Sequence, residues 1–232
     1  MQRTFSQRHI ILPVIHVESE TQALRNVQIA RNANVDGVFL INHAISSSEL
    51  LTIHHTVVSE HNDWWVGVNC LDLSPIEIFQ SIDNTVRGVW VDNAMIDEDF
   101  DSQPEAERIL DARRKAGWTG LYFGGVAFKY QRPVADLAQA AAIAAKYVDV
   151  VTTSGPGTGH AALPEKISTM KQSLGTHPLA IASGITPENV GDYLDSADCF
   201  LVATGISKSF EELDPKRVQA LVHRIRTYSS RS

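Results

Sequence analysis

The sequence is poor in cysteine and has no long apolar run, and both gaps argue against whole classes of protein. Its 232 residues contain two cysteines, Cys70 and Cys199, which lie far apart in the chain. A fold held by disulfide bonds is not expected, and no CxxC pair suggests a zinc site. No apolar stretch approaches the roughly 18 residues of a membrane-spanning helix, and the amino-terminal segment lacks the apolar core of a signal peptide. We expect a cytoplasmic protein with no membrane partner.

Positive charge is also scarce. The chain has 20 Lys and Arg against 27 Asp and Glu, which gives a formal net charge of −7 at pH 7. A general nucleic-acid partner is not expected, because neutralising a phosphate backbone needs a basic face, although a local basic pocket remains compatible with this charge. No low-complexity tract, linker or charge run divides the sequence. We therefore predict a single domain over residues 1–232.

Eight short apolar runs follow one another along the chain, and segments with helical spacing separate them. Each run is nearly continuously apolar instead of alternating with polar residues, which is typical of parallel strands buried on both faces. The runs span residues 11–17, 36–42, 64–70, 88–93, 120–128, 148–154, 178–184 and 199–205.

Helical patterns are clearest in four of the intervening segments, residues 21–33, 105–117, 134–147 and 215–228. The second of these ends in a basic turn and Gly117, as the carboxyl end of a helix favours. Repeated alternation of strand and helix predicts a parallel sheet, and at this length the closed (β/α)8 TIM barrel is the leading architecture. An open, doubly wound sheet is the alternative.

Two similar corners occur late in the sequence, IASGITPENV at 181–190 and LVATGISK at 201–208. In each, an apolar strand stops at a glycine beside a hydroxyl, and Gly184 and Gly205 permit a close approach of the backbone to a ligand. Two corners on neighbouring strands, with a helical turn expected at 207–213, direct several backbone amides to one point. We predict a phosphate site there; the alternative is a pair of ordinary tight turns. The predicted phosphate-binding residues are Ser183, Gly184, Thr204, Gly205 and Ser207.

A third glycine cluster, SGPGTG at 154–159, follows the sixth predicted strand. Alone it is weak evidence for a site, but its place beside the two corners favours a loop that folds over a ligand. The residues expected to contact the substrate there are Ser154, Gly155, Thr158 and Gly159.

Taken together, residues 150–208 resemble the BtpA-like family of ribulose-phosphate-binding TIM barrels. That family shows a TG-x-x-TG segment after strand six, a GSGVTPENV-type segment at strand seven and a strand eight that ends in GT-S. The resemblance implies a TIM barrel and a phosphate-type ligand, and it departs from the family pattern at Gly205, where a serine is common. The matching positions are Ser154, Gly155, Thr158, Gly159, Ser183, Gly184 and 186–190.

The resemblance extends, less specifically, to the ends of four earlier strands. His16 matches the histidine that ends the family's first strand, and Asn42 and Asn69 match the ends of strands two and three. Lys129 matches the lysine of a Lys-His pair, but Tyr130 stands where the family has the histidine. From these matches we expect Asn42 and Asn69 to bind substrate.

Three residues are candidates for catalysis, Lys129, His16 and Asp92. Alternate residues of a barrel strand point inward, and Lys129 shares its parity with two small residues, Gly125 and Ala127, which leave room beneath it. Its ammonium would stabilise a phosphate or an enolate, or form a Schiff base; a solvated loop lysine is the alternative. His16 is a candidate acid or base, or else a core histidine, and Asp92 is a candidate general base, or else a cap for the following loop.

Signals for a metal or a cofactor are weak, and no cofactor is predicted. The acidic loop 95–105 lacks the glycine and distal glutamate of a calcium loop, so we expect a lid or a solvated loop and keep Mg²⁺ only as an alternative. Cys70 and Asp72 would suit an acid/base pair, although a cysteine is more often inert and buried. A helix surface is expected to carry His54, His55 and His61.

These features predict a cytosolic enzyme that acts on a small phosphorylated metabolite, such as a sugar or ribosyl phosphate. The expected step is acid/base proton transfer by an isomerase, an epimerase or a lyase. The alternative is a non-catalytic BtpA-like factor that binds a ligand or assists assembly, and the missing histidine at Tyr130 leaves it open. The expected partner is the small phosphorylated ligand, with a homo-oligomer as a further expectation by analogy with other barrels.

Overall fold

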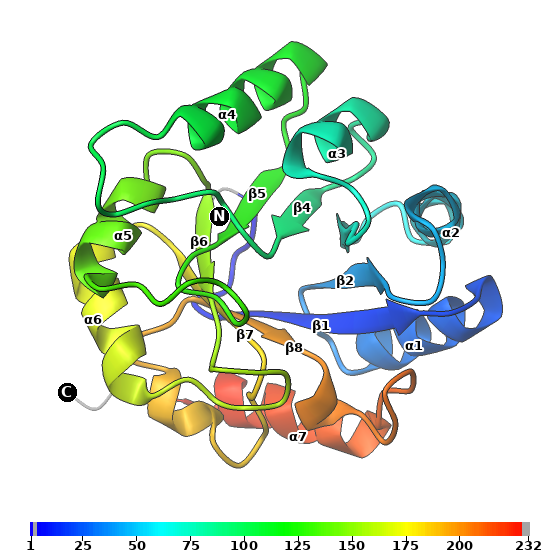
Figure 1. Cartoon of the computed structure of the whole chain (residues 1–232). Helices are drawn as coiled ribbons and strands as arrows, with labels where there is room; N and C mark the ends of the chain where they lie inside the picture. Colours follow the sequence, from blue (N-terminus) through cyan, green and yellow to red (C-terminus); the bar gives the residue numbers. More distant parts are fainter. Residues whose placement is uncertain (2–3, 229–232) are drawn as a thin grey trace.

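The computed structural model describes residue 1 and residues 4–228, and its centre is a closed barrel of eight parallel strands (Figure 1). Each strand pairs with the next one along the chain, and β8 closes the ring on β1. The predicted TIM barrel is therefore confirmed, and the open sheet is wrong. The strands are β1 Ile10–Val17, β2 Gly37–Asn42, β3 Trp65–Asn69, β4 Gly88–Val91, β5 Leu121–Gly125, β6 Val150–Thr153, β7 Leu179–Ala182 and β8 Cys199–Val202.

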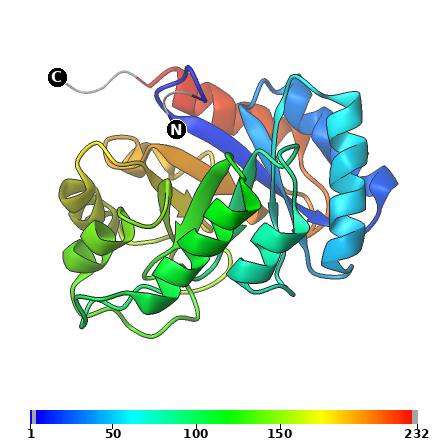
Figure 2. The same ribbon diagram turned by 90° about the horizontal axis from the view of Figure 1, so that it is seen from above.

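Within the described residues, seven α-helices form an outer layer around the barrel, as Figures 1 and 2 show from two directions. All four of the predicted helical segments are helices here, with small differences at their ends. Gly117 ends α4 with a φ of 62°, the left-handed conformation that glycine adopts without steric cost. The helices are α1 Glu20–Asn32, α2 Ser47–Glu60, α3 Pro75–Ser81, α4 Pro104–Ala116, α5 Leu137–Ala144, α6 Pro164–Leu174 and α7 Pro215–Arg226.

Between β7 and β8 a single 3₁₀ turn, η1 (Val190–Tyr193), replaces the α-helix that the sequence predicts. Its start is capped in both directions. Asn189 Oδ1 accepts the Thr186 amide at 2.8 Å, and Thr186 Oγ1 accepts the Asn189 amide at 3.3 Å. Asn189 thus takes the part that Glu or Gln plays at the same position of an ordinary capping box.

The helical turn expected at 207–213 is wrong, because that segment is a loop of bends closed by an antiparallel bridge between Ser207 and Leu213, after the short 3₁₀ turn η2 (Thr204–Ile206). The side chain of Asn26 on α1 holds this loop. Its Nδ2 donates to the Glu211 carbonyl, and its Oδ1 accepts the Leu213 amide, both at 2.8 Å. Contacts with α1 therefore satisfy backbone groups that a helix would have paired internally.

Large aromatic rings fill the amino-terminal part of the barrel, and glycines on neighbouring strands make room for them. Phe39 and Trp65 pack edge to face with ring centroids 5.1 Å apart. A Cβ at Gly67 would lie 2.5 Å from the Phe39 ring, and one at Gly88 would lie 2.3 Å from the Trp65 ring. Both distances are too short for real side chains, so these glycines are required by packing. The barrel is closed at this end by side chains.

An aspartate stands immediately before β2, β6 and β8, and each one joins a neighbouring strand to an outer helix. Asp198 Oδ2 accepts the Leu179 amide of β7 at 2.8 Å and the Lys171 ammonium of α6 at 2.7 Å. The other two repeat this arrangement, Asp36 with the Ile11 amide and Arg226, and Asp149 with the Tyr122 amide and Arg113. The amino end of the barrel is therefore fastened by a repeated hydrogen-bonded ion pair.

The expectation that His54 lies on a helix surface is wrong. His54, expected on the helix surface, is fully buried on α2, and both of its ring nitrogens lack a partner in the described structure. Burial lowers the pKa of His54 to about 4. His55, the next residue, is exposed.

Two further observations bear on the overall predictions. None of the described helices is long and apolar enough to span a membrane. The predicted domain covers residues 1–232, of which residues 2–3 and 229–232 lie outside the described residues.

Candidate functional site

A cavity of about 160 Å³ opens at the carboxyl ends of the strands, where TIM barrels hold their active sites. Every strand, or the loop after it, contributes to its lining. The residues that come earlier along the strands form an apolar floor of Val14, Ile41, Trp90, Ala182 and Leu201. The rim is polar and consists of His16, His43, Asp92, Lys129, Thr158, Ser183 and Thr204, with Leu71 and Phe210 beside them.

Asp92 is a half-buried carboxylate at the end of β4. Its Oδ1 accepts the Asn69 side-chain amide at 3.1 Å. Burial raises the pKa of Asp92 above its ordinary value, while the Asn69 hydrogen bond and the charge of Lys129 limit that rise. A carboxylate with a raised pKa in a cleft is suited to accept a proton from carbon.

Lys129 lines the cavity, as expected, from the loop after β5. Its ammonium lies 3.3 Å from the Thr158 hydroxyl, and it forms no ion pair within the part of the chain that the structure describes. Its backbone amide donates to Ser154 Oγ at 2.8 Å. The rim therefore carries a positive charge whose near partner is a neutral hydroxyl.

His16 and His43 meet at the opposite side of the rim, with ring centroids 5.0 Å apart. Phe210, from the loop after β8, covers His16 at a centroid distance of 3.9 Å. Burial, and then the neighbouring His43, lower the pKa of His16 to about 4, so its imidazole is neutral at neutral pH. His16 Nδ1 has no hydrogen-bond partner among the described residues.

The end of β2 presents a different residue to the cavity from the one expected. Asn42 was expected to bind substrate, but the strand alternation turns His43 inward and Asn42 outward. The Asn42 side chain donates to Asp72 at 2.7 Å and accepts the Leu71 amide at 2.8 Å, so it fixes the loop after β3. Parity with Phe39 would have pointed to His43 from the sequence.

Asn69 at the end of β3 and Cys70 after it do not line the cavity. Asn69 does not line the cavity but binds Asp92, which does. The Cys70 thiol is buried, and burial raises its pKa to about 11. It is protonated at neutral pH, which weighs against an acid/base pair with Asp72.

The glycine-rich loop after β6 lies along the rim. Thr158 lines the cavity, and Ser154 holds the backbone of Lys129. The Gly159 amide donates to Ser183 Oγ at 2.9 Å, which ties this loop to the end of β7. A Cβ at Gly155 would lie 2.1 Å from the His160 carbonyl, so Gly155 allows the loop to fold on itself.

The two glycine corners are closely packed against other backbone. Gly184 has a φ of 73°, and a Cβ there would lie 2.3 Å from backbone atoms of His160 and Ala161. A Cβ at Gly205 would lie 1.8 Å from the Ile185 carbonyl oxygen. Within residues 1 and 4–228, the amides of Gly184 and Gly205 donate to no acceptor. The corners thus combine tight backbone packing with unpaired donors.

Side chains at the corners divide into two groups. Ser183 and Thr204 line the cavity. Ser207, predicted to bind phosphate, donates to the Ala203 carbonyl at 2.9 Å and is not part of the lining.

With this geometry established, a family model described as the BtpA family matches residues 21–227. The chain belongs to the BtpA family. The match covers β2 to β8 and all seven helices except the first residue of α1, so it includes most of the cavity lining. No curated protein matches this BtpA chain in sequence.

Solved structures share the fold of the BtpA chain at low sequence identity. A native KDPGal structure has a TM-score of 0.69 and 14% identity, covering 96% of this chain and 97% of that one. Phosphoribosyl anthranilate isomerase from Thermus thermophilus has a TM-score of 0.64 and 12% identity, covering 94% of this chain and 98% of that one. (S)-3-O-geranylgeranylglyceryl phosphate synthase from Thermoplasma acidophilum, in complex with sn-glycerol-1-phosphate, has a TM-score of 0.69 and 13% identity. The match covers 98% of this chain and 96% of that one.

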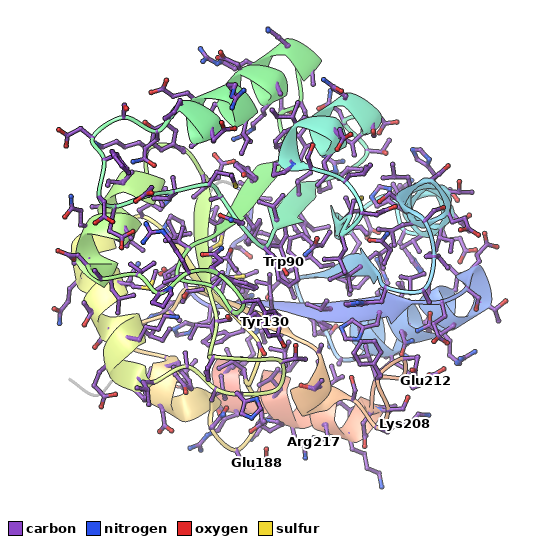
Figure 3. All side chains as sticks on the ribbon, in the orientation of Figure 1. Trp90, Tyr130, Glu188, Lys208, Glu212 and Arg217 are labelled. Atoms are coloured by element: carbon purple, nitrogen blue, oxygen red, sulfur yellow. The ribbon has the colours of Figure 1, made fainter. Side chains whose placement is uncertain are left out.

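Beyond the cavity, an ion pair braces the β8 corner of the BtpA protein. Arg217 on α7 pairs with Glu188 at 2.9 Å and donates from Nε to the Gly205 carbonyl at 2.8 Å. Figure 3 places these two side chains together at the periphery, whereas Trp90 lies near the centre of the barrel. Tyr130, which replaces the family histidine, is 82% exposed, and its hydroxyl lies 3.4 Å from Thr158 Oγ1.

The acidic loop 95–105, expected to be a lid or a solvated loop, is held by ion pairs and a hydrogen bond to the segment after β5. Glu98 is buried and forms an ion pair with Arg132, and its Oε1 also accepts the Ala135 amide at 2.8 Å. Asp97 binds the same guanidinium at 2.7 Å. No group of three or more His, Cys, Asp or Glu in the described structure is placed to hold a metal ion.

Proposed function

We propose that this BtpA-family protein is an enzyme that transfers protons on a small phosphorylated metabolite. The observation that carries the proposal is the set of groups around one small cavity. Its lining includes a carboxylate with a raised pKa, an ammonium that forms no ion pair with the described residues, and a neutral buried histidine. Such groups cluster where catalysis needs them and are rare in purely structural contacts.

Asp92 is the proposed general base. It takes a proton from the carbon beside a carbonyl group, and Lys129 stabilises the negative charge that develops on the carbonyl oxygen. His16, neutral at neutral pH, returns or relays a proton between oxygen atoms. Isomerisation, epimerisation and retro-aldol cleavage all use this arrangement, since each passes through an enediolate or enolate.

The phosphate lies, in this proposal, between the ends of β7 and β8. The unpaired amides of Gly184 and Gly205 and the hydroxyls of Ser183 and Thr204 donate to its oxygens. The cavity volume of about 160 Å³ is well below that of pockets for drug-sized ligands, which start at roughly 300 Å³. The substrate is accordingly small, of the size of a triose to pentose phosphate.

Two structural neighbours lend support by their described ligands. One is a phosphoribosyl anthranilate isomerase, and another holds sn-glycerol-1-phosphate. At 12% and 13% identity they share the fold with this chain, and only the fold is carried over.

A panel of triose, tetrose and pentose phosphates tests this proposal. We expect one or more to raise the melting temperature of the wild-type protein and to exchange a carbon-bound hydrogen for deuterium in ²H₂O. Ser183→Ala and Thr204→Val are expected to reduce the thermal shift. A protein that binds none of the panel would contradict the proposal.

We further propose that the reaction is independent of metal ions, because Arg132 occupies the acidic loop that could otherwise attract Mg²⁺. Treatment with EDTA is expected to leave the deuterium exchange unchanged. Loss of exchange that added Mg²⁺ restores would show that this part of the proposal is wrong.

A second candidate, a BtpA-like binding or assembly factor, is favoured by the distribution of exposed apolar side chains. Within the described residues, every exposed large hydrophobic side chain lies on a loop that follows a strand, on the same face as the cavity. Apolar groups gathered on one face are typical of surfaces that contact a partner. Under this candidate, Phe100→Ser abolishes partner binding and Asp92→Asn does not. The side chains are Leu71, Met95, Phe100, Tyr130, Leu163 and Phe210.

A further inference from the structure

Lys166, in the first turn of α6, reaches back to the ends of two strands and forms no ion pair with a carboxylate of the described residues. Its ammonium donates to the Ala127 carbonyl at 2.6 Å and to the Ser154 carbonyl at 2.7 Å. Ala127 follows β5 and Ser154 follows β6, so one side chain bridges the two strands at the mouth. Neither the sequence pattern nor the roles proposed above account for it.

One of the two carbonyls, that of Ala127, belongs to the backbone that carries Lys129, and the other belongs to Ser154, whose side chain binds the Lys129 amide. Ala127 has a φ of 47°, a conformation that non-glycine residues seldom adopt, and it lies two residues before Lys129. Ser154 Oγ in turn accepts the Lys129 amide at 2.8 Å. The strained turn and its hydrogen bond therefore share one partly buried anchor, the Lys166 ammonium.

From this geometry we propose that Lys166 is a positioning residue, which fixes the backbone of Lys129 so that its ammonium points into the cavity. The inference rests on the proposed function only in giving Lys129 a role in the reaction. A charged donor strengthens bonds to neutral carbonyls, and two such bonds stabilise a turn that the backbone alone does not favour.

The bridge is sensitive to pH. Burial alone lowers the pKa of Lys166 to about 8. The ionisable groups on the adjoining segments are Lys129, Tyr130, Arg132 and Asp136 between β5 and α5, His160 after β6 and Glu165 on α6; burial, and not the charge of any of them, lowers this pKa. The charged bridge is complete below about pH 8 and weakens as the pH rises through that value, because the neutral amine keeps its N–H donors but loses the charge.

Hydrogen exchange at the Lys129 amide tests the proposal without any substrate. Lys166→Met removes the ammonium and keeps a similar apolar stem, whereas Lys166→Arg keeps a charge at all accessible pH values. Lys171→Met is the matched control, because Lys171 lies on the same helix but binds Asp198 and the His177 carbonyl at the other end of the barrel. Binding of inorganic phosphate is measured in parallel by NMR titration.

We expect the protection factor of the Lys129 amide to fall about tenfold or more in Lys166→Met, as the loss of a charge-assisted hydrogen bond implies. It should be unchanged in Lys171→Met. Wild-type protection should fall between pH 7 and pH 9, and Lys166→Arg should retain it. Unchanged protection in Lys166→Met, or an equal loss in Lys171→Met, would overturn the inference. Failure of the wild type to bind phosphate would instead count against the proposed function alone.

Discussion

The cavity and the amino end of the barrel handle charge in opposite ways. At the amino end, Asp36, Asp149 and Asp198 each bind a backbone amide of the neighbouring strand and a basic side chain of an outer helix. At the mouth, Asp92 is held by a neutral amide, and Lys129 contacts a neutral hydroxyl. Neither forms an ion pair with another described residue.

This difference separates stability from function. Charges that find partners within the fold hold strands and helices together, as expected at the end of a TIM barrel that does not carry the active site. Charges left without ionic partners in a cleft raise the free energy of the empty protein and can be stabilised by a ligand. The cavity, with Asp92 and Lys129, is thus the place where a bound ligand can supply the missing ionic partners.

The largest effect should come from removing the carboxylate at the mouth. Asp92→Asn is nearly isosteric and eliminates the base, so we expect proton transfer on the substrate to slow by about 10²-fold to 10⁴-fold. The melting temperature should stay the same or rise, because a buried carboxylate is lost. Deuterium exchange into substrate and a thermal melt measure the two quantities. Full activity in Asp92→Asn would remove Asp92 from the mechanism.

The matched change at the amino end should have the reverse outcome. Asp198→Ala leaves the Leu179 amide and the Lys171 ammonium without their acceptor, which costs about 2 to 3 kcal/mol of unfolding free energy. In a chain of this size that corresponds to a fall in melting temperature of about 5 to 10 °C. Ligand affinity should not change. A loss of affinity with no loss of stability would break the distinction between the two ends.

Acid should destabilise the fold through its buried histidines. His54 has a pKa of about 4 in the folded protein and about 6.5 when unfolded, so the unfolded state binds more protons between these values. The free energy of unfolding should fall, by at most on the order of 3 kcal/mol for His54, as the pH drops from 6.5 to 4. Urea titrations at several pH values measure this free energy, and it should depend less steeply on pH in His54→Leu. The exposed neighbour provides the control, since His55→Leu should keep the wild-type slope.

A smaller effect is expected from uncovering His16 at the mouth. Phe210→Ala removes the ring that covers the imidazole at 3.9 Å and lets water reach it. The pKa of His16 should rise from about 4 by about one unit, since its lowering comes mainly from burial. An NMR titration follows His16 and His54 together, and His54 should not move. No change at His16 would mean that the other cavity walls are enough to keep it dry.

Much of the fold follows from sequence because it depends on local patterns. The eight apolar runs became the eight strands, and the glycine before strand five, Gly117, ends α4 as its position predicts. Errors arose where contacts distant in sequence decide the local structure. Residues 207–213 form a non-helical loop because Asn26, far earlier in the chain, binds their backbone. Glu98 is buried because Arg132 is within reach.

The site was predictable in part for the same reason. Lys129 lies in the cavity as expected, although β5 ends at Gly125 and the turn at Ala127, not strand alternation, sets its position. The end of β2 was assigned by family resemblance to Asn42, while parity favours His43. Lys166 was not predictable, because its partners are backbone carbonyls that carry no sequence signal. The roles of the catalytic and phosphate-binding residues remain predictions.

In the proposed function, the Gly184 and Gly205 amides at the ends of β7 and β8 bind an oxyanion beside Asp92 and Lys129. A crystal structure of the wild-type protein grown with inorganic phosphate tests this binding directly. We expect a phosphate within hydrogen-bond distance of both amides. Phosphate bound elsewhere, with the space above these glycines closed by protein atoms, would contradict it.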